Sequence, residues 1–414
     1  METQIKTVEQ SEPETLNEIE AQYTAVRAAF GIIDRTDTGK LAIKGADRFS
    51  WLQAMVSNDV RLLEKGNTNR LQSCILDATG HVLSTMTLIN IHSNVNASLN
   101  PGINDANSFV LMELPVGNTA KIAALLDRYL IMEDVEIEDV SSQWGCLSIQ
   151  GIQTKIQTGS SSENNNPLHS LRVFRSKFMK SGDVSLDASS VVADADHTGS
   201  GGWDLYLREA EYARIKASWQ RQGHPFIGES AQEILRIEAG IVKYGVDMDE
   251  TTLAPEAGLM STHVSLTKGC YVGQEIVARI DSRGHTNRAL TGLVFAEGDV
   301  PGFGDKIHAL EIIETGAGAG ATDLDPVAKI TVAKSNTDQN MRETGRITSV
   351  VASSPVMNGR PISLGYVRHE HREPGRRLQV RSGTRTLEAE VVALPFYTRP
   401  VAPRSELNTS SSSL

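Results

Sequence analysis

Residues 267–280 read TKGCYVGQEIVARI, and this stretch divides the chain into two parts with different patterns. Its second half predicts a short helix, Gly273–Ile280, and helical and strand-like patterns alternate before it. From about residue 286 to Tyr397 the chain carries short strand-like segments separated by Gly and Pro turns, without a strong helical pattern. The sequence therefore predicts an α+β region followed by a C-terminal all-β barrel or sandwich at about 286–400.

The composition excludes several classes of protein. The 414 residues favour two or three domains, and 40 Lys and Arg against 51 Asp and Glu leave a net charge of −11. That charge disfavours direct binding of nucleic acid, although it permits a local basic pocket for a small anion. No apolar run approaches the roughly 18–20 residues of a membrane span. With three scattered cysteines and an acidic N-terminus unlike a signal peptide, we expect a cytoplasmic protein without membrane partners.

The N-terminal region, residues 21–225, predicts two α+β lobes with a boundary near 95–140. A hairpin over 70–90 turns at Asp77–Gly80, and helices are expected at 21–30, after Asp47 and at 118–130. We expect residues 226–285 to continue this region. Polar, low-complexity composition predicts a disordered acidic tail (1–20), a second tail (401–414) and two surface insertions (about 155–202 and 314–340).

A carboxylate stands on the apolar face of one predicted helix. The segment GESAQEILRIEAG at 228–240 begins with a capping-box pattern, Ser230 to Glu233, and its apolar stripe also carries Glu238. A carboxylate packed among apolar side chains is costly unless it is paired. Glu238 therefore predicts either an internal salt bridge or a buried acceptor for a polar ligand.

A cysteine precedes the predicted helix at 273–280. Cys270 lies two residues from Lys268 and close to the helix N-terminus, an arrangement that lowers a thiol pKa and favours the reactive thiolate. The alternative is a buried structural cysteine. Cys74 and Cys146 read as core residues, and His369-Glu370-His371 reads as a solvated loop because no third metal ligand is suggested nearby.

Several segments together resemble one family. RIEAGIVKYGVDMDETTLAPEAGL (236–259), TKGCYVGQEIVAR (267–279) and RGHTNRAL (283–290) are similar to the folate-binding YgfZ proteins, relatives of the glycine-cleavage T-protein, an aminomethyltransferase. FGIIDRTDTGKLAIKGAD near the N-terminus, VSNDV at 56–60 and SLGYVRHEH at 363–371 match as well. The resemblance implies a T-protein-like ring of three domains with a C-terminal β-barrel.

The resemblance also implies a ligand and its site. Tetrahydrofolate, or a one-carbon derivative, would occupy the central opening, with Glu238, Tyr244 and Glu256 lining the pterin site and Arg288 binding the carboxylate or amide portion. Cys270 would be the functional thiol, assisted by Lys268. The remaining residues of the KGCYxGQE motif are Gly269, Tyr271, Gly273, Gln274 and Glu275.

One departure from the aminomethyltransferases bears on the reaction. Those enzymes carry an aspartate pair just after the glycine turn of the hairpin, where this chain has Ser84 and Thr85. A hydroxyl cannot replace an ionised carboxylate in assisting C–N cleavage. We therefore expect an accessory protein that supports assembly or repair of iron–sulfur clusters, and so the maturation of iron–sulfur enzymes such as those modifying tRNA. Its partners would be client proteins or assembly factors. The alternatives are a folate-dependent aminomethyl- or methyltransferase and a folate sensor without chemistry.

Overall fold

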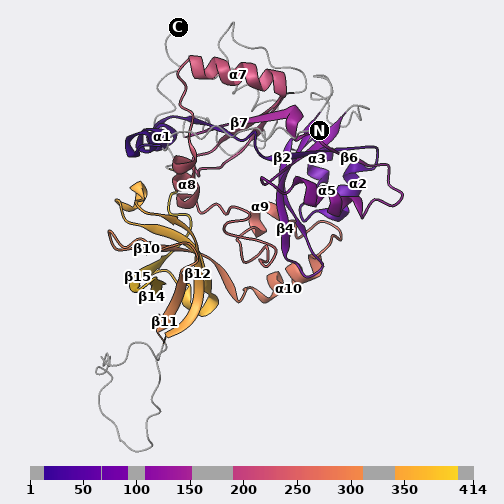
Figure 1. Cartoon of the computed structure of the whole chain (residues 1–414). Coiled ribbons are helices and arrows are strands. Elements are labelled where there is room, and N and C mark those ends of the chain that lie inside the picture. The colour runs from indigo at the N-terminus through magenta and orange to yellow at the C-terminus, as the bar shows by residue number, and fades with distance from the viewer. Residues whose placement is uncertain (1–13, 67, 92–107, 152–189, 311–340, 400–414) are drawn as a thin grey trace, which may run out of the picture.

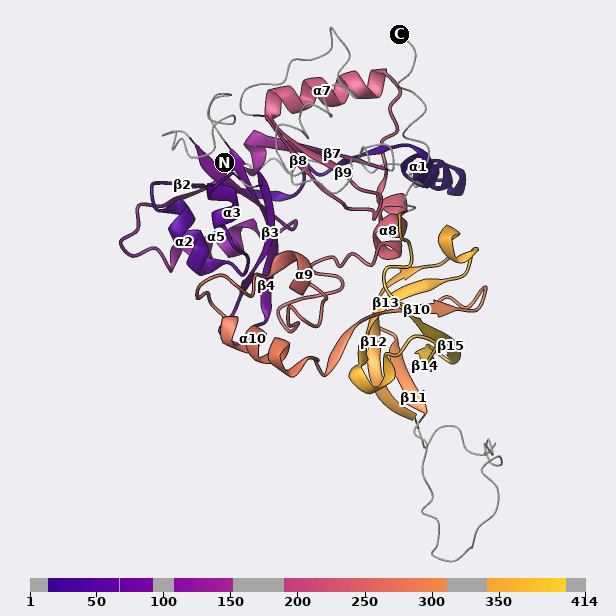
Figure 2. The ribbon, with the colours of Figure 1, turned by 180° about the vertical axis from the view of Figure 1, so that it is seen from behind.

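Three parts of the chain are arranged as a ring in the computed structural model (Figures 1 and 2). The structure describes residues 14–66, 68–91, 108–151, 190–310 and 341–399. No helix in these ranges is long and apolar enough to cross a lipid bilayer.

The first part is a five-stranded sheet in the order β3-β4-β5-β2-β6. Alternating apolar residues pack it against short helices, through side chains such as Leu52, Leu63 and Leu126. The predicted hairpin is confirmed as β3 and β4, and the predicted helices as α2 and α5. The elements are β2 (Gly39–Lys44), α2 (Arg48–Met55), α3 (Arg61–Glu64), β3 (Arg70–Leu76), β4 (Val82–Ile91), β5 (Phe109–Leu114), α5 (Thr119–Asp127) and β6 (Glu136–Asp139).

The second part is a four-stranded sheet in the order β1-β7-β9-β8. Helix α7 packs on it through Ile215 and Trp219, and α1 lies near the end that leads to α8 (Figure 1). Its elements are α1 (Leu16–Ala28), β1 (Gly31–Asp34), a 3₁₀ turn η1 (Ser141–Gln143), β7 (Trp144–Gln150), β8 (Val191–Asp194), β9 (Gly202–Arg208), α7 (Glu209–Arg221) and α8 (Glu229–Glu238).

The third part is a closed barrel of six strands, β10-β13-β12-β11-β14-β15, which confirms the predicted all-β C-terminal region. Inward side chains such as Phe295, Val367 and Val380 fill it. Its elements are β10 (Arg288–Phe295), β11 (Lys306–Leu310), β12 (Met341–Val351), η3 (Pro355–Met357), β13 (Ile362–Arg368), η4 (His369–His371), β14 (Arg377–Ser382) and β15 (Arg385–Val392).

An irregular stretch between α8 and the barrel connects all three parts. It carries α9 (Met260–His263) and α10 (Gln274–Arg283), the latter confirming the helix expected at 273–280. Within it, residues 251–258 form a cross-piece between the first sheet and the barrel. Val82 N–H donates to the Thr252 carbonyl at 2.9 Å, and Leu290 N–H donates to the Glu256 carbonyl at 2.8 Å.

Three local expectations are wrong. The acidic tail does not extend to residue 20, because Thr15 and Glu18 form a capping box that starts α1 at Leu16. The box expected at Ser230 is absent: Gly228 caps α8, and the Ser230 N–H donates to Glu14 at 3.2 Å. The insertion expected at 155–202 ends earlier, because β8 begins at Val191. Residues 152–189 and 311–340 lie outside the described ranges, and the second tail does as well.

Candidate functional site

A cavity of about 760 Å³ lies where the three parts meet. Both sheets, α9, the end of the cross-piece and the segment after the barrel contribute to its wall. The polar lining residues are Arg35, Thr38, Arg70, Gln72, Thr85, Thr87, Glu113, Asp196, His197, Ser261, Thr262 and His263, and the apolar ones include Met86, Ile241, Val242, Met248, Leu259 and Leu290.

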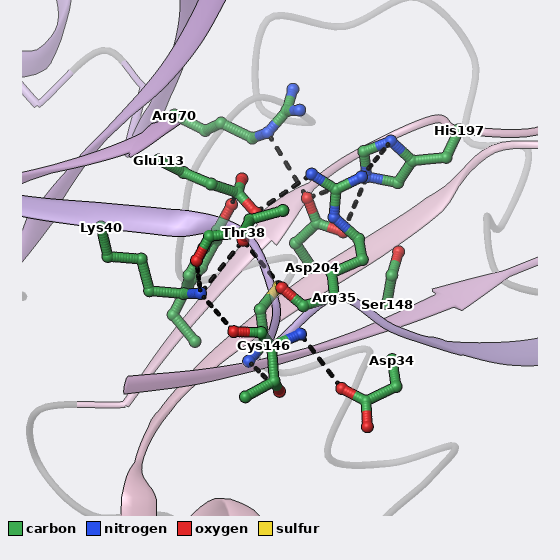
Figure 3. Close-up of polar contacts among 12 residues, drawn as sticks. Asp34, Arg35, Thr38, Lys40, Arg70, Glu113, Cys146, Ser148, His197 and Asp204 are labelled. Atoms are coloured by element: carbon green, nitrogen blue, oxygen red, sulfur yellow. Dashed lines mark hydrogen bonds and ion pairs between the residues drawn. The ribbon is translucent and has the colours of Figure 1, made fainter. Parts of the chain in front are cut away.

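A polar network joins the two sheets beside this cavity (Figure 3). Arg35 donates through Nη2 to Glu113 Oε1 at 3.0 Å, and its Nη1 lies 3.1 Å from His197 Nδ1. His197 Nε2 lies 3.0 Å from both oxygens of Asp204. Tyr206 donates to the second Glu113 oxygen at 2.7 Å. Arg35 therefore links a carboxylate of the first sheet to the histidine–aspartate pair of the second.

The network keeps its acids ionised. Burial alone would raise the pKa of Asp204, but His197, Arg35 and Arg70 outweigh it and hold that pKa well below its usual value. Burial acts in the same direction on Glu113, yet Arg35 lowers the pKa of that carboxyl overall. With charges fixed by neighbours, these side chains form a rigid polar wall rather than a proton-transferring pair.

Arg35 and Arg70 both keep a buried Nε without a hydrogen-bond partner among the described residues, and Arg70 makes the fewer contacts of the two within the network. The Arg70 Nε lies 3.8 Å from an Asp204 oxygen. Buried donors are rarely left unmatched, so Arg70 is suited to receive an acceptor atom from a ligand in the cavity.

The hairpin contributes hydroxyls to the cavity wall. Thr85 and Thr87 line it, whereas Ser84 is fully buried and accepts a hydrogen bond from Asn118 at 3.1 Å. No carboxylate therefore reaches the cavity from β4. The carboxylates that line it among the described residues are Glu113, which is fully bonded, and Asp196, which accepts from the backbone N–H groups of Thr198 and Gly199.

His263, at the end of α9, adds a neutral imidazole. Burial, together with the charge of Arg70, lowers the pKa of His263 to about 4. Its Nδ1 lies 2.7 Å from the Thr262 hydroxyl. The ring therefore offers the cavity a donor or an acceptor without a charge.

Glu238 does not line the cavity. Its carboxylate is completely buried and accepts from Arg27 at 2.8 Å, Tyr23 at 2.8 Å and Ser354 at 2.7 Å. Of the two alternatives for Glu238, these contacts support the internal salt bridge. This bridge ties α1 and α8 to the loop that follows β12.

The other three residues expected to bind the folate also lie outside the cavity lining. Glu256 and Arg288 form an ion pair with Nε and Oε2 3.0 Å apart, and both line a different pocket. Tyr244 donates to the Leu83 carbonyl of the hairpin at 2.6 Å. Their sequence neighbours Ala257 and Leu290 line the cavity instead. Glu256 and Tyr244, expected at the pterin, and Arg288, expected at the carboxylate or amide portion, thus do not line this cavity, and their roles toward folate stay predictions.

The KGCYxGQE loop is anchored by three residues. Lys268 is buried, and its ammonium donates to the carbonyls of Val56 at 2.5 Å and Asn58 at 2.8 Å. Burial lowers the pKa of Lys268 to about 8. Tyr271 packs in a core cluster, and Gly273 has φ +82° with a virtual Cβ 2.5 Å from the Asp77 carbonyl, so a side chain does not fit there.

The cysteines differ sharply in access. Cys270 is exposed, whereas Cys74 and Cys146 are buried, as expected for the latter two. The Lys268 ammonium is committed to backbone carbonyls, so its expected assistance to the Cys270 thiol is not seen. Gly269 and Glu275 are exposed, and Gln274 is half-buried at the start of α10.

The sequence interpretation missed the polar network. His197 lies within the expected insertion at about 155–202 and Asp204 just after it, and no motif marks Glu113 or Arg70. A signal existed: Glu113 and Asp204 are carboxylates within apolar strands, FVLMEL and GWDLYLR. The argument applied to Glu238, that a buried carboxylate must be paired, would have singled them out.

Two protein-family models match most of the chain. The family described as "GCVT N-terminal domain" matches residues 6–268, and "Glycine cleavage T-protein C-terminal barrel domain" matches residues 322–398. A Listeria monocytogenes protein named aminomethyltransferase is 23% identical over 381 residues, covering 92% of this chain and 90% of that protein. One from Rubrobacter xylanophilus is 27% identical over 385 residues, covering 92% and 87%.

A solved structure has a similar fold. The glycine cleavage system aminomethyltransferase T from Bartonella henselae aligns with a TM-score of 0.66 at 17% identity, covering 92% of this chain and 90% of that one. The expected three-domain, T-protein-like architecture is therefore confirmed.

Proposed function

Because the chain belongs to the family of the GCVT N-terminal domain, we propose that its central cavity binds tetrahydrofolate or a one-carbon derivative. The cavity, at about 760 Å³, is within the range of small-molecule and cofactor sites. The pterin carbonyl would accept from Arg70, whose Nε has no hydrogen-bond partner among the described residues. The N–H groups of the pterin would donate to acceptors on Gln72, His263 and the threonines of β4. Met86, Met248 and Leu290 would cover the apolar faces of the pterin ring.

The proposed ligand would not be a substrate for aminomethyl transfer here. Such a transfer needs an ionised acid placed to assist C–N cleavage, and β4 presents Thr85 at the wall instead of a carboxylate. Glu113 has both oxygens engaged by Arg35, Thr38 and Tyr206. The residues present thus fit a folate-binding role better than transferase chemistry.

We propose further that the protein is of the YgfZ type and supports assembly or repair of iron–sulfur clusters, including those of tRNA-modifying enzymes. The observation that carries this proposal is the structure of the KGCYxGQE loop. Lys268, Tyr271 and Gly273 are anchors, and the loop they hold presents the exposed thiol of Cys270. A single thiol cannot hold a cluster alone, so Cys270 would act together with thiols of a client or assembly factor.

Calorimetry with tetrahydrofolate tests whether this ligand binds in the central cavity. Arg70→Gln should weaken binding by about 5–150-fold, the cost of roughly 1–3 kcal/mol for a lost buried hydrogen bond. Arg377→Gln, at an exposed position of the barrel, is the matched control and should bind like wild type. Equal affinity in the Arg70 variant would remove the cavity assignment.

A deletion strain tests the proposed role in the assembly or repair of iron–sulfur clusters. Activities of several iron–sulfur enzymes should fall in the strain and recover with the wild-type gene but not with Cys270→Ser. The relatives named aminomethyltransferase make transferase activity the competing function. Formation of methylenetetrahydrofolate from an aminomethyl donor at a sustained rate would favour that function over the accessory role.

A further inference from the structure

A second pocket, of about 640 Å³, is lined by residues of the cross-piece and of β10 other than those that line the central cavity. We call it the outer pocket. Glu256 lines it while Ala257 lines the cavity, and on β10 Arg288 lines it while Leu290 lines the cavity. Its lining residues are His81, Thr251, Leu253, Glu256, His285, Asn287, Arg288, Arg368, His369 and Glu370.

Two arginines face each other across the strands at this pocket. Arg288 and Arg368 are directly paired in the register of β10 and β13. Like charges directly opposite on antiparallel strands are destabilising unless something compensates them. Glu256 neutralises Arg288 at 3.0 Å, but Arg368 makes no ion pair with any described residue of the chain. The neighbouring Glu370 carboxylate acts on Arg368 only at longer range, so this guanidinium has no direct ion-pair partner among the described residues.

Imidazoles extend the same surface. The rings of His285 and His369 stack with centroids 4.4 Å apart and an interplanar angle of 24°. The backbone N–H of His369 donates to the Asn287 carbonyl at 2.9 Å, which joins the two segments that carry the rings. Glu370 is the remaining acid of the pocket, and it lies 4.0 Å from the imidazole of His371. The pocket thus presents guanidinium and imidazole N–H donors beside the carboxylates of Glu256 and Glu370.

We propose that the outer pocket binds an oxyanion, held by Arg368 and Arg288 with the histidine pair as further donors. A phosphate or carboxylate group matches the planar fork of a guanidinium, and its charge would relieve the repulsion between the two arginines. The same chemistry has two sources: a small phosphorylated metabolite, or the poly-γ-glutamyl tail of a folate whose pterin occupies the central cavity. The second source rests on the proposed function, and the first does not.

The first arm of the test uses inorganic pyrophosphate as the probe. Calorimetry with the full chain in a phosphate-free buffer should show binding, and Arg368→Gln should weaken it at least about tenfold, as loss of a charge-assisted hydrogen bond predicts. Arg368 is exposed, so the substitution leaves the core unchanged. Arg377→Gln removes the same charge from the same barrel, outside the pocket, and should bind like wild type.

The second arm compares monoglutamyl with pentaglutamyl tetrahydrofolate. If the tail is the source, the pentaglutamyl form binds more tightly, and Arg368→Gln removes that gain while the monoglutamyl affinity stays unchanged. Failure of both folates to bind contradicts the folate function but leaves the pyrophosphate arm intact. The outer-pocket proposal is overturned if Arg368→Gln changes neither probe, or if Arg377→Gln weakens pyrophosphate equally.

Discussion

Glu238 illustrates how a buried side chain contributes to stability rather than to ligand binding. Its carboxylate is surrounded by Arg27, Tyr23 and Ser354, and the Arg27 guanidinium also lies 3.5 Å from the centre of the Tyr397 ring. Each hydrogen-bond acceptor of the carboxylate meets a donor, so its burial is compensated. The contacts join four segments that are distant in the sequence.

Replacing Glu238 should therefore reduce stability. Glu238→Ala would leave Arg27 buried without its counter-charge, and breaking such a pair costs about 3–5 kcal/mol in the free energy of unfolding. Urea denaturation monitored by tryptophan fluorescence measures this. Glu275→Ala, which breaks the exposed pair with Arg279, is the control and should cost less than about 1 kcal/mol. A Glu238 variant as stable as the control would contradict the buried pair.

His263 should make stability depend on pH. Burial and Arg70 lower its pKa to about 4 from the usual 6.5, so below about pH 6.5 the unfolded chain binds a proton that the folded protein does not. Its contribution is therefore lost as the pH falls from about 6.5 to about 4, and between pH 7 and 4.5 the loss should be about 2 kcal/mol. Urea denaturation of wild type and His263→Asn at both pH values measures it. Parallel losses in both proteins would contradict it.

At the scale of elements, the loop before α10 contains two kinds of residue. Some pack against N-terminal segments and fix the loop, and one, Cys270, is exposed. Lys268 binds carbonyls of the 56–58 segment, and Gly273 lies against the hairpin turn at Asp77. The loop thus depends on two N-terminal segments that lie about 200 residues earlier in the chain. Cys270 is held outside this packing.

The three thiols should differ in reactivity. Burial raises the pKa of Cys74 to about 12, and burial with the nearby Asp204 and Glu113 raises the pKa of Cys146 well above its usual value. In the native protein at pH 7, iodoacetamide should modify Cys270 and spare the other two. Peptide mass spectrometry over time reads the rates, and urea should expose all three. If Cys270 reacts slowest, its role as an accessible thiol fails.

Gly273 should resist substitution more than another glycine of the same conformation. Gly273 and Gly284 flank α10 with φ +82° and +81°, but a Cβ at Gly273 would lie 2.5 Å from the Asp77 carbonyl, whereas one at Gly284 meets nothing within 4 Å. Gly284→Ala should cost about 1 kcal/mol from the backbone alone. Gly273→Ala should cost clearly more, by urea denaturation. Equal costs would show that the loop moves away without penalty.

At the scale of the whole molecule, the central cavity is lined by residues from all three parts of the ring. Arg70 belongs to the first sheet, His197 to the second and Leu290 to the barrel, so a bound ligand contacts all three parts of the ring. Binding at such a junction stabilises the arrangement of the parts as well as each part alone.

Tetrahydrofolate should accordingly raise the resistance of the whole chain to unfolding. At a concentration about 100 times the Kd, the expected gain is about 2.7 kcal/mol. Thermal unfolding with and without ligand measures the shift. At the same concentration, an about 5–150-fold weaker affinity of Arg70→Gln should reduce the gain to between about 1.8 and about 0.3 kcal/mol. A ligand-induced shift that is the same in this variant would place folate elsewhere.

The sequence by itself determined the elements and the family resemblance, because these depend on local patterns. Apolar periodicity, the Asp77–Gly80 turn and the Gly-rich short strands after residue 286 predicted the hairpin, the helices and the barrel. The KGCYxGQE motif predicted the helix that follows it. The burial of Glu238 was likewise visible as a carboxylate on an apolar stripe.

Only the tertiary structure decided which side chains face the cavity. A shift of one residue along a strand or turn reverses a side chain's direction, so Glu256 and Ala257 reach different pockets although they are neighbours. Arg27 meets Glu238 across 211 residues, and Arg35 meets Glu113 and His197 across 78 and 162. Such pairings arise from the packing of distant elements, and no local pattern contains them.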